Sequence, residues 1–72
     1  MKKIIMSGKK TIDVNNKYYI EVTYNNTHRL YQLIDRHTDK MIVESFNRDA
    51  FLLKVNKIVK LNNNIELIVA SI

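Results

Sequence analysis

The stretch from residue 47 to 61 (NRDAFLLKVNKIVKL) constrains the fold most, because it is the one part of the chain that predicts an amphipathic helix. Its apolar residues recur at helical spacing and gather on one side. These residues are Phe51, Leu52, Val55, Ile58 and Val59. Asn47 stands where its side-chain oxygen can cap the first free amides, and Asp49 is favourable near the positive end of the helix dipole. The apolar side needs a cover, and the other segments predict strands that supply it.

Strands are predicted in the segments that precede this helix. Residues 3–14 are interpreted as one irregular strand around Gly8, because glycine tolerates the backbone angles of a turn or a bulge. Alternating apolar side chains predict further strands over 18–24 (YYIEVTY), 29–35 (RLYQLID) and 41–46 (MIVESF). The polar turns that join these strands into a meander are residues 15–17, 25–28 and 36–40.

The last segment, residues 65–72 (IELIVASI), is apolar on both faces and predicts a buried strand after an asparagine turn at 62–64. A strand that follows a helix suggests a right-handed crossover onto the sheet. The predicted fold class is therefore α+β: a small, mostly antiparallel sheet of about five strands with one helix packed on one face, in the order β-β-β-β-α-β. Residues 1–72 are expected to form a single domain.

Composition narrows the function classes. The chain has 72 residues, near the size at which one core is only marginally sufficient, and it has no cysteine for disulfides or a thiolate zinc site. No segment predicts a signal peptide or a membrane span, so a cytoplasmic protein without a membrane partner is expected. The net charge of +5 favours encounters with phosphate backbones and with acidic protein surfaces. Frequent Asn, Ile, Lys and Tyr, whose codons are AT-rich, suggest a bacterial or phage origin.

The turn DRHTD places Asp35, His37 and Asp39 at alternating positions, where they could face a divalent ion. Arg36 and Lys40 sit among them and would oppose a cation, so a polar hairpin turn is the better interpretation. His28 and His37 could act as acid–base groups, but neither has a nucleophile or a carboxylate partner beyond what a polar turn contains anyway, so both are interpreted as solvated loop residues. We therefore expect no metal, no cofactor and no enzymatic activity.

One helix covers about one face of a small sheet, so Tyr19, Tyr31 and Leu33, or else their alternates, are expected on the uncovered face. Tyrosines interleaved with basic residues are the composition that a sheet uses to hold nucleic acid. This reasoning predicts a small binding module, such as a phage or mobile-element regulator, that contacts nucleic acid through the open sheet face and basic turns. The predicted contact residues are Lys9, Lys10, Tyr19, Arg29, Tyr31, Arg36 and Lys40.

The run DRHTDKMIVESFNRDAFLLKV resembles, in its layout, the three-strand-plus-helix DNA-binding domains at the N-terminus of some phage-type integrases. The shared layout is a polar hairpin turn, a strand ending in Phe46 and then a helix, and it spans residues 18–61. The additional strands at both ends depart from that pattern. Because the resemblance includes no diagnostic motif, it assigns no role to any residue of this chain.

A protein partner explains the same features. The chain would then be an inhibitor or adaptor, for example a phage-encoded inhibitor of a host system, or a homodimer that pairs its sheets. Positive charge would serve solubility or an acidic protein partner, and Tyr31→Ala would break the assembly. Under both hypotheses, Lys54, Lys57 and Lys60 are interpreted as a solvated helix face.

Overall fold

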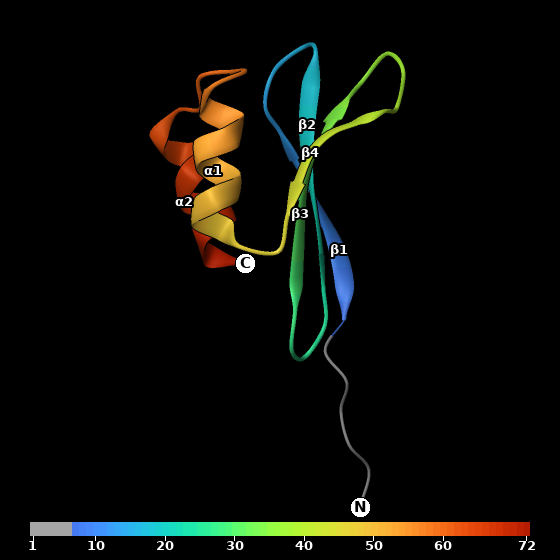
Figure 1. Ribbon diagram of the computed structural model, residues 1–72, viewed down its shortest axis with the longest axis vertical. Coiled ribbons are helices and arrows are strands. Elements are labelled where there is room, and N and C mark those ends of the chain that lie inside the picture. Colours follow the sequence, from blue (N-terminus) through green and yellow to red (C-terminus); the bar gives the residue numbers. More distant parts are fainter. Residues whose placement is uncertain (1–6) are drawn as a thin grey trace, which may run out of the picture.

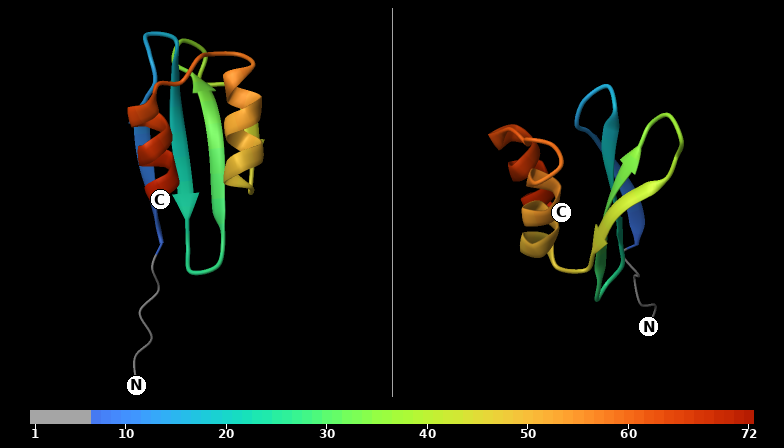
Figure 2. Two further views of the ribbon diagram at one scale, coloured as in Figure 1. Left: turned by 90° about the vertical axis from the view of Figure 1, so that its left-hand side faces the viewer. Right: turned by 45° about the horizontal axis from the view of Figure 1, so that its top comes forward.

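The computed structural model describes residues 7–72, in which a four-stranded antiparallel sheet carries two helices on one face (Figures 1 and 2). The strands are β1 (Gly8–Asp13), β2 (Tyr18–Tyr24), β3 (Arg29–Asp35) and β4 (Met41–Ser45). The helices are α1 (Arg48–Asn56) and α2 (Asn63–Ser71). Strand order in the sheet follows the chain, so hairpins make every connection within it. The α+β class and the meander are confirmed, whereas the fifth strand predicted over residues 65–72 is wrong.

Asparagine and aspartate side chains build the hairpin turns. The Asn15 Oδ1 atom accepts hydrogen bonds from the backbone N–H groups of Lys17 (2.8 Å) and Tyr18 (2.9 Å). Asn25 does the same in the next turn, and Asp35 in the third. These local bonds replace strand pairing and reverse the chain, which is why the turns fall where the sequence predicts them.

Strand register decides which side chains face the helices. Ile20 pairs with Ile12 on β1 and with Leu33 on β3, and Val22 pairs with Tyr31. Paired residues share a face of the sheet, and all five of these side chains are buried. Of the two arrangements left open by the sequence, the one with Tyr31 and Leu33 on the uncovered face is therefore wrong, and their alternates on β3 face outward.

Tyr19 pairs with Ile34, so these two side chains lie on the uncovered face. At the next step, β4 contains an irregularity, because Leu33 pairs with Val43 while Ile34 pairs with Met41. Ile42 is thus the extra residue of a β-bulge, a feature that bends an edge strand and discourages pairing with another chain.

Helix α1 begins where the sequence predicts and ends earlier. The Asn47 side chain accepts a hydrogen bond from the Ala50 N–H (2.9 Å), which confirms the cap. Phe51 and Val55 are buried beneath the helix. Ile58 was expected on this buried side, but it lies beyond the end of the helix and is exposed.

The segment predicted as a buried final strand is helix α2, and this is the main correction to the predicted fold. Asn62 caps the helix by accepting a hydrogen bond from the Ile65 N–H (2.9 Å). Ile65 and Val69, four residues apart, are buried, whereas Leu67 and Ile68 are exposed. A strand would alternate at every second residue, so this burial pattern belongs to a helix.

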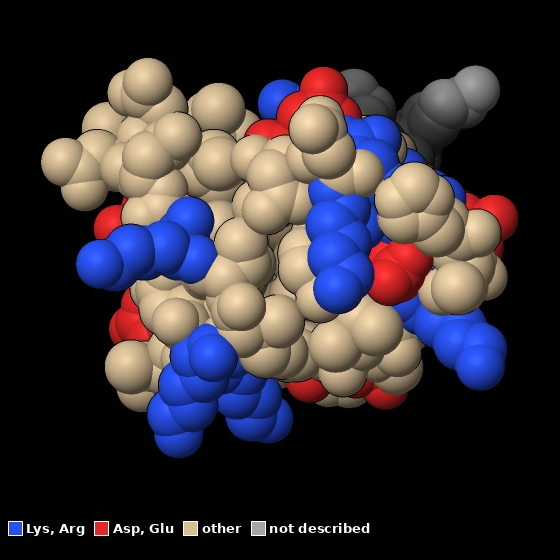
Figure 3. All heavy atoms as spheres, turned by 90° about the horizontal axis from the view of Figure 1, so that it is seen from above, with Lys and Arg blue, Asp and Glu red and all other residues tan. Residues whose placement is uncertain are grey.

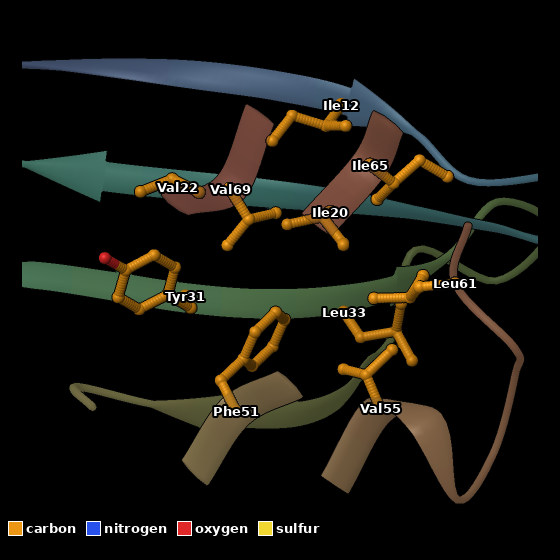
Figure 4. Close-up of a cluster of buried hydrophobic side chains, with 10 residues drawn as sticks. All are labelled: Ile12, Ile20, Val22, Tyr31, Leu33, Phe51, Val55, Leu61, Ile65 and Val69. Atoms are coloured by element: carbon orange, nitrogen blue, oxygen red, sulfur yellow. The ribbon is translucent and has the colours of Figure 1, made fainter. Parts of the chain in front are cut away.

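The core lies between the sheet and the two helices (Figure 4). Helix α1 packs over β3 and β4, and α2 packs on the side of β1 (Figure 2). The cluster consists of Ile12, Ile20, Val22, Tyr31, Leu33, Phe51, Val55, Leu61, Ile65 and Val69. Two short helices thus supply the cover that was expected from one longer helix, and the opposite sheet face remains open.

Gly8 is the first residue of β1, and the part of the predicted strand at residues 3–6 lies outside the described residues. A Cβ atom at Gly8 would come within 2.9 Å of the Tyr24 hydroxyl oxygen. Close approach of this ring favours glycine here. The predicted turn or bulge at Gly8 is not observed, because Gly8 pairs with Tyr24 in a regular ladder.

Candidate nucleic-acid interface

Three loops meet at one end of the molecule, the upper end in Figure 1: residues 14–17, 36–40 and 57–62. Six basic residues lie on these loops or on the last turn of α1 beside them. They are Lys17, Arg36, Lys40, Lys54, Lys57 and Lys60, and we call this region the basic end. Figure 3 views it face-on and shows lysine and arginine side chains standing out around an uncharged centre.

Arg36 fastens two of these loops together. Its backbone N–H donates to the Lys17 carbonyl (2.8 Å), and its Nε donates to the Asn15 carbonyl (2.9 Å). The guanidinium also pairs with Asp13 and lies over the Tyr19 ring, with 5.4 Å between Cζ and the ring centroid. These four contacts fix the 14–17 and 36–40 loops relative to each other, so the charges on them keep a defined spacing.

In the part of the chain that the structure describes, none of the basic-end lysines forms an ion pair with a carboxylate, although the pKa of Asp35 is lowered first by the His37 N–H and, to a lesser extent, by the charge of Lys17. Among residues 7–72, the ion pairs are Lys9 with Glu21, Arg36 with Asp13, and Arg48 with Asp49. All five lysines of the basic end are exposed. Their charges therefore remain available to a ligand of opposite charge.

Carboxylates also occur at this end, and most of them are engaged. Asp13 pairs with Arg36, and Glu66 accepts a hydrogen bond from the Asn56 side chain (3.3 Å). Asp35 accepts hydrogen bonds from the backbone N–H groups of His37 (2.8 Å) and Thr38 (3.2 Å). The pKa of Asp35 lies below its usual 3.8, chiefly because the His37 N–H stabilises the charged form. Asp39 is exposed in the same loop.

The open sheet face does not have the expected basic character. Among the strand residues of this face, Lys9 is the only cation, against Asp13, Glu21 and Glu44. Lys9 is already paired with Glu21 (3.3 Å), and Gln32 donates to Glu44 (3.1 Å). An excess of carboxylates repels phosphate, so the electrostatics favour the basic end over the sheet face.

The structure separates the residues that the sequence grouped as one site. Tyr19, Arg36 and Lys40 lie at the basic end or beside it. Lys9 lies further along the open face. Tyr31 is 4% exposed and faces the core, so its ring is not available for stacking on a base.

Lys10 and Arg29 lie at the opposite end, where they line a hollow of about 330 Å³ beside the end of α2. The Arg29 guanidinium donates to the carbonyls of Ile72 (2.6 Å) and Asn25 (3.1 Å), which places a cation at the negative end of the helix dipole. Arg29 is thus held by contacts within the chain, and neither residue joins the basic end.

Sequence reasoning missed four lysines of the basic end. Lys54, Lys57 and Lys60 were interpreted as one solvated face of a long helix, and Lys17 as part of a turn. In the structure, α1 ends at Asn56, so Lys57 and Lys60 belong to the 57–62 loop. This loop lies at the same end of the molecule as the 14–17 and 36–40 loops. The signal that could have found them is the three-residue spacing of lysines running into the asparagine-rich turn.

Among the described residues, no group of three histidine or carboxylate side chains is arranged to hold a metal ion. No helix in this part of the chain is long and apolar enough to cross a membrane. Comparisons with protein-family models, curated proteins and solved structures find no match to the chain.

Proposed function

We propose that the chain is a non-enzymatic binding module that contacts the phosphate backbone of nucleic acid through its basic end. The observation that carries the proposal is the convergence, at one end of the molecule, of five exposed lysines that form no ion pair among the described residues, four on the three loops and Lys54 on the last turn of α1. Phosphate contacts from lysine and arginine side chains supply most of the affinity of such modules and are independent of sequence. A regulator of a phage or mobile element would use this contact.

Rigid spacing supports a phosphate backbone over a single small anion. Arg36 clamps the 14–17 loop to the 36–40 loop, and α1 holds Lys54 one turn before Lys57. Charges distributed over a broad end suit a polymer with regularly spaced phosphates, because each cation can meet a different phosphate. Tyr19, partly exposed beside Arg36, adds an aromatic surface for an unstacked base or a sugar.

The test is a titration of the chain against labelled single-stranded and duplex DNA and RNA at about 50 and 200 mM salt. We expect binding that weakens steeply with salt, with a slope of log K against log salt near −4 to −5 on duplex DNA if five phosphates are neutralised. The strand form that binds best then shows whether Tyr19 takes part. Absence of binding at the lower salt contradicts the proposal.

A protein partner is the second candidate, and exposed apolar side chains favour it. Large hydrophobic residues at the surface are Met41, Ile42, Phe46, Leu53, Ile58, Leu67 and Ile68. Where such residues form a contiguous patch, the patch commonly marks a protein contact. If nucleic acid does not bind, an inhibitor or adaptor with an acidic or apolar target becomes the leading proposal.

A further inference from the structure

The two helices leave a groove between them on their solvent side, with a volume of about 460 Å³. Its apolar lining is Leu52 from α1 together with Leu67 and Ala70 from α2. Leu67 is 67% exposed, on the opposite side of its helix from Ile65 and Val69. We call this region the helix groove. It combines an apolar hollow with a protruding leucine, so the leucine of a second copy of the chain can fill the hollow of the first.

Charge is arranged with a direction along the helix groove. At one end, the Arg48 guanidinium donates to the carbonyl of Ala70 (3.2 Å), near the last turn of α2. Towards the other end, Glu66 in the first turn of α2 accepts from the Asn56 side chain (3.3 Å). Arg48, which also pairs with Asp49 (3.6 Å), therefore lines one end of the helix groove, and Glu66 lines the other.

We propose that the helix groove is the contact surface between two copies of this chain, related by a two-fold axis perpendicular to the groove. Such an axis exchanges the two ends, so Arg48 of each copy comes opposite Glu66 of the other, and this charge pair forms twice. In the same operation, Leu67 of each copy enters the apolar hollow of the other.

The charge of the whole molecule directs the second copy to this face. Two chains of net charge +5 repel one another over most of their surface. Around the helix groove the balance is reversed, because Asp49 and Glu66 face a single cation, Arg48. The basic end lies beyond the groove. A second copy therefore meets less repulsion here than at the basic end, and it leaves the proposed nucleic-acid contact uncovered.

Size gives a further reason. The chain is 72 residues long and its core cluster contains ten of them, which is near the lower limit for a stable single core. Burial of Leu67 and of the groove lining against a second copy adds apolar area to this small core. The dimer would carry its two basic ends at opposite ends, because the two-fold axis reverses the helices.

Sedimentation equilibrium of the full chain tests the proposal. We expect a mass of twice 8.5 kDa at a chain concentration of about 100 µM. Leu67→Glu should sediment as a folded monomer, since Leu67 contributes little to the core within one chain. Ile42→Glu, which changes an exposed residue of β4 instead, should remain dimeric. A monomeric wild-type chain, or a dimeric Leu67→Glu variant, overturns the proposal.

Charge reversal tests the orientation. Arg48→Glu and Glu66→Arg should each weaken the dimer about tenfold or more, because like charges then face each other. A mixture of the two variants should recover the dimer, since each heterodimer contains one wild-type Arg48–Glu66 pair and one pair with its signs exchanged. Structural changes within one chain cannot produce this recovery.

A mixture of labelled Arg48→Glu with Glu44→Arg, whose altered residue lies on the open sheet face, is the matched control: the labelled chain should remain more weakly associated than wild type, because the carboxylate introduced at position 48 still faces Glu66 in its heterodimer. If the first mixture dissociates as readily as its two components, the two-fold arrangement is wrong.

Discussion

Tyr31 of β3 stacks on Phe51 of α1, with ring centroids 5.6 Å apart and ring planes inclined by 29° (Figure 4). Both rings are buried, and they join the sheet to the helix at the centre of the core. Such an aromatic pair contributes about 0.5–1.5 kcal/mol beyond the burial of its area. Tyr31 therefore stabilises the fold, and a substitution of Tyr31 would affect the binding of a partner only by destabilising the folded chain.

Tyr31→Ala should lower the free energy of unfolding by about 3–5 kcal/mol, as large aromatic truncations in cores do. Urea denaturation followed by circular dichroism measures this loss. Leu30→Ala is the matched control, because Leu30 lies next to Tyr31 on β3 and faces the open side, partly exposed. It should cost about 1 kcal/mol. Equal effects of the two substitutions would contradict the register described here.

The strands were predictable because two independent local signals agree on them. Alternation of apolar residues gives the bounds of β2 and β3, and asparagine or aspartate side chains place the turns between strands. The α2 segment lacks such agreement. Its run of branched apolar residues suits a buried strand as well as a helix, and only the four-residue spacing of Ile65 and Val69 distinguishes them.

Asn62 marks the difference between these two interpretations. Asn62→Ala removes the cap on the Ile65 N–H and should cost about 1 kcal/mol of stability. Asn64→Ala changes a neighbouring exposed asparagine inside the helix, where alanine is a good helix former, and should be neutral or slightly stabilising. Urea denaturation of both variants checks this pair. A loss at Asn64 without a loss at Asn62 is incompatible with α2.

The candidate site was less predictable than the fold, because it depends on which loops share an end of the molecule. Lys57 and Lys60 lie at the same end of the molecule as Lys17 and Lys40 only because α1 ends at Asn56, so that both lysines belong to the loop that follows it. Lys10 and Lys9 are adjacent in sequence, yet strand pleating sends them to opposite faces. The positions of charged residues along the sequence predict neither which lysines share an end of the molecule nor which lie on the same face of the sheet.

This placement can be tested with lysines alone. Lys57→Gln combined with Lys60→Gln should reduce the salt slope of duplex DNA binding by about 1.8, because two phosphate contacts are lost. Lys10→Gln removes the same kind of charge at the opposite end and should leave the slope unchanged. The measurement is a salt series of fluorescence anisotropy titrations. A loss of slope in Lys10→Gln equal to that of a single basic-end lysine would assign the binding to net charge rather than to this end.

Asp35 gives the 36–40 loop a pH dependence. Its pKa is lowered from 3.8, first by the His37 N–H and also by the Thr38 N–H, while partial removal from water acts in the opposite direction. A carboxyl group with a lower pKa in the folded state stabilises the fold above its unfolded pKa. That contribution is lost as the pH falls through the folded value, below 3.8.

Asp35→Asn keeps an oxygen for both hydrogen bonds but has no charge. It should therefore melt below wild type at about pH 7, and the gap should close as the pH falls below about 3.8. Thermal melts across this range measure the gap, and a gap of constant size would show that the charge of Asp35 does not stabilise the loop.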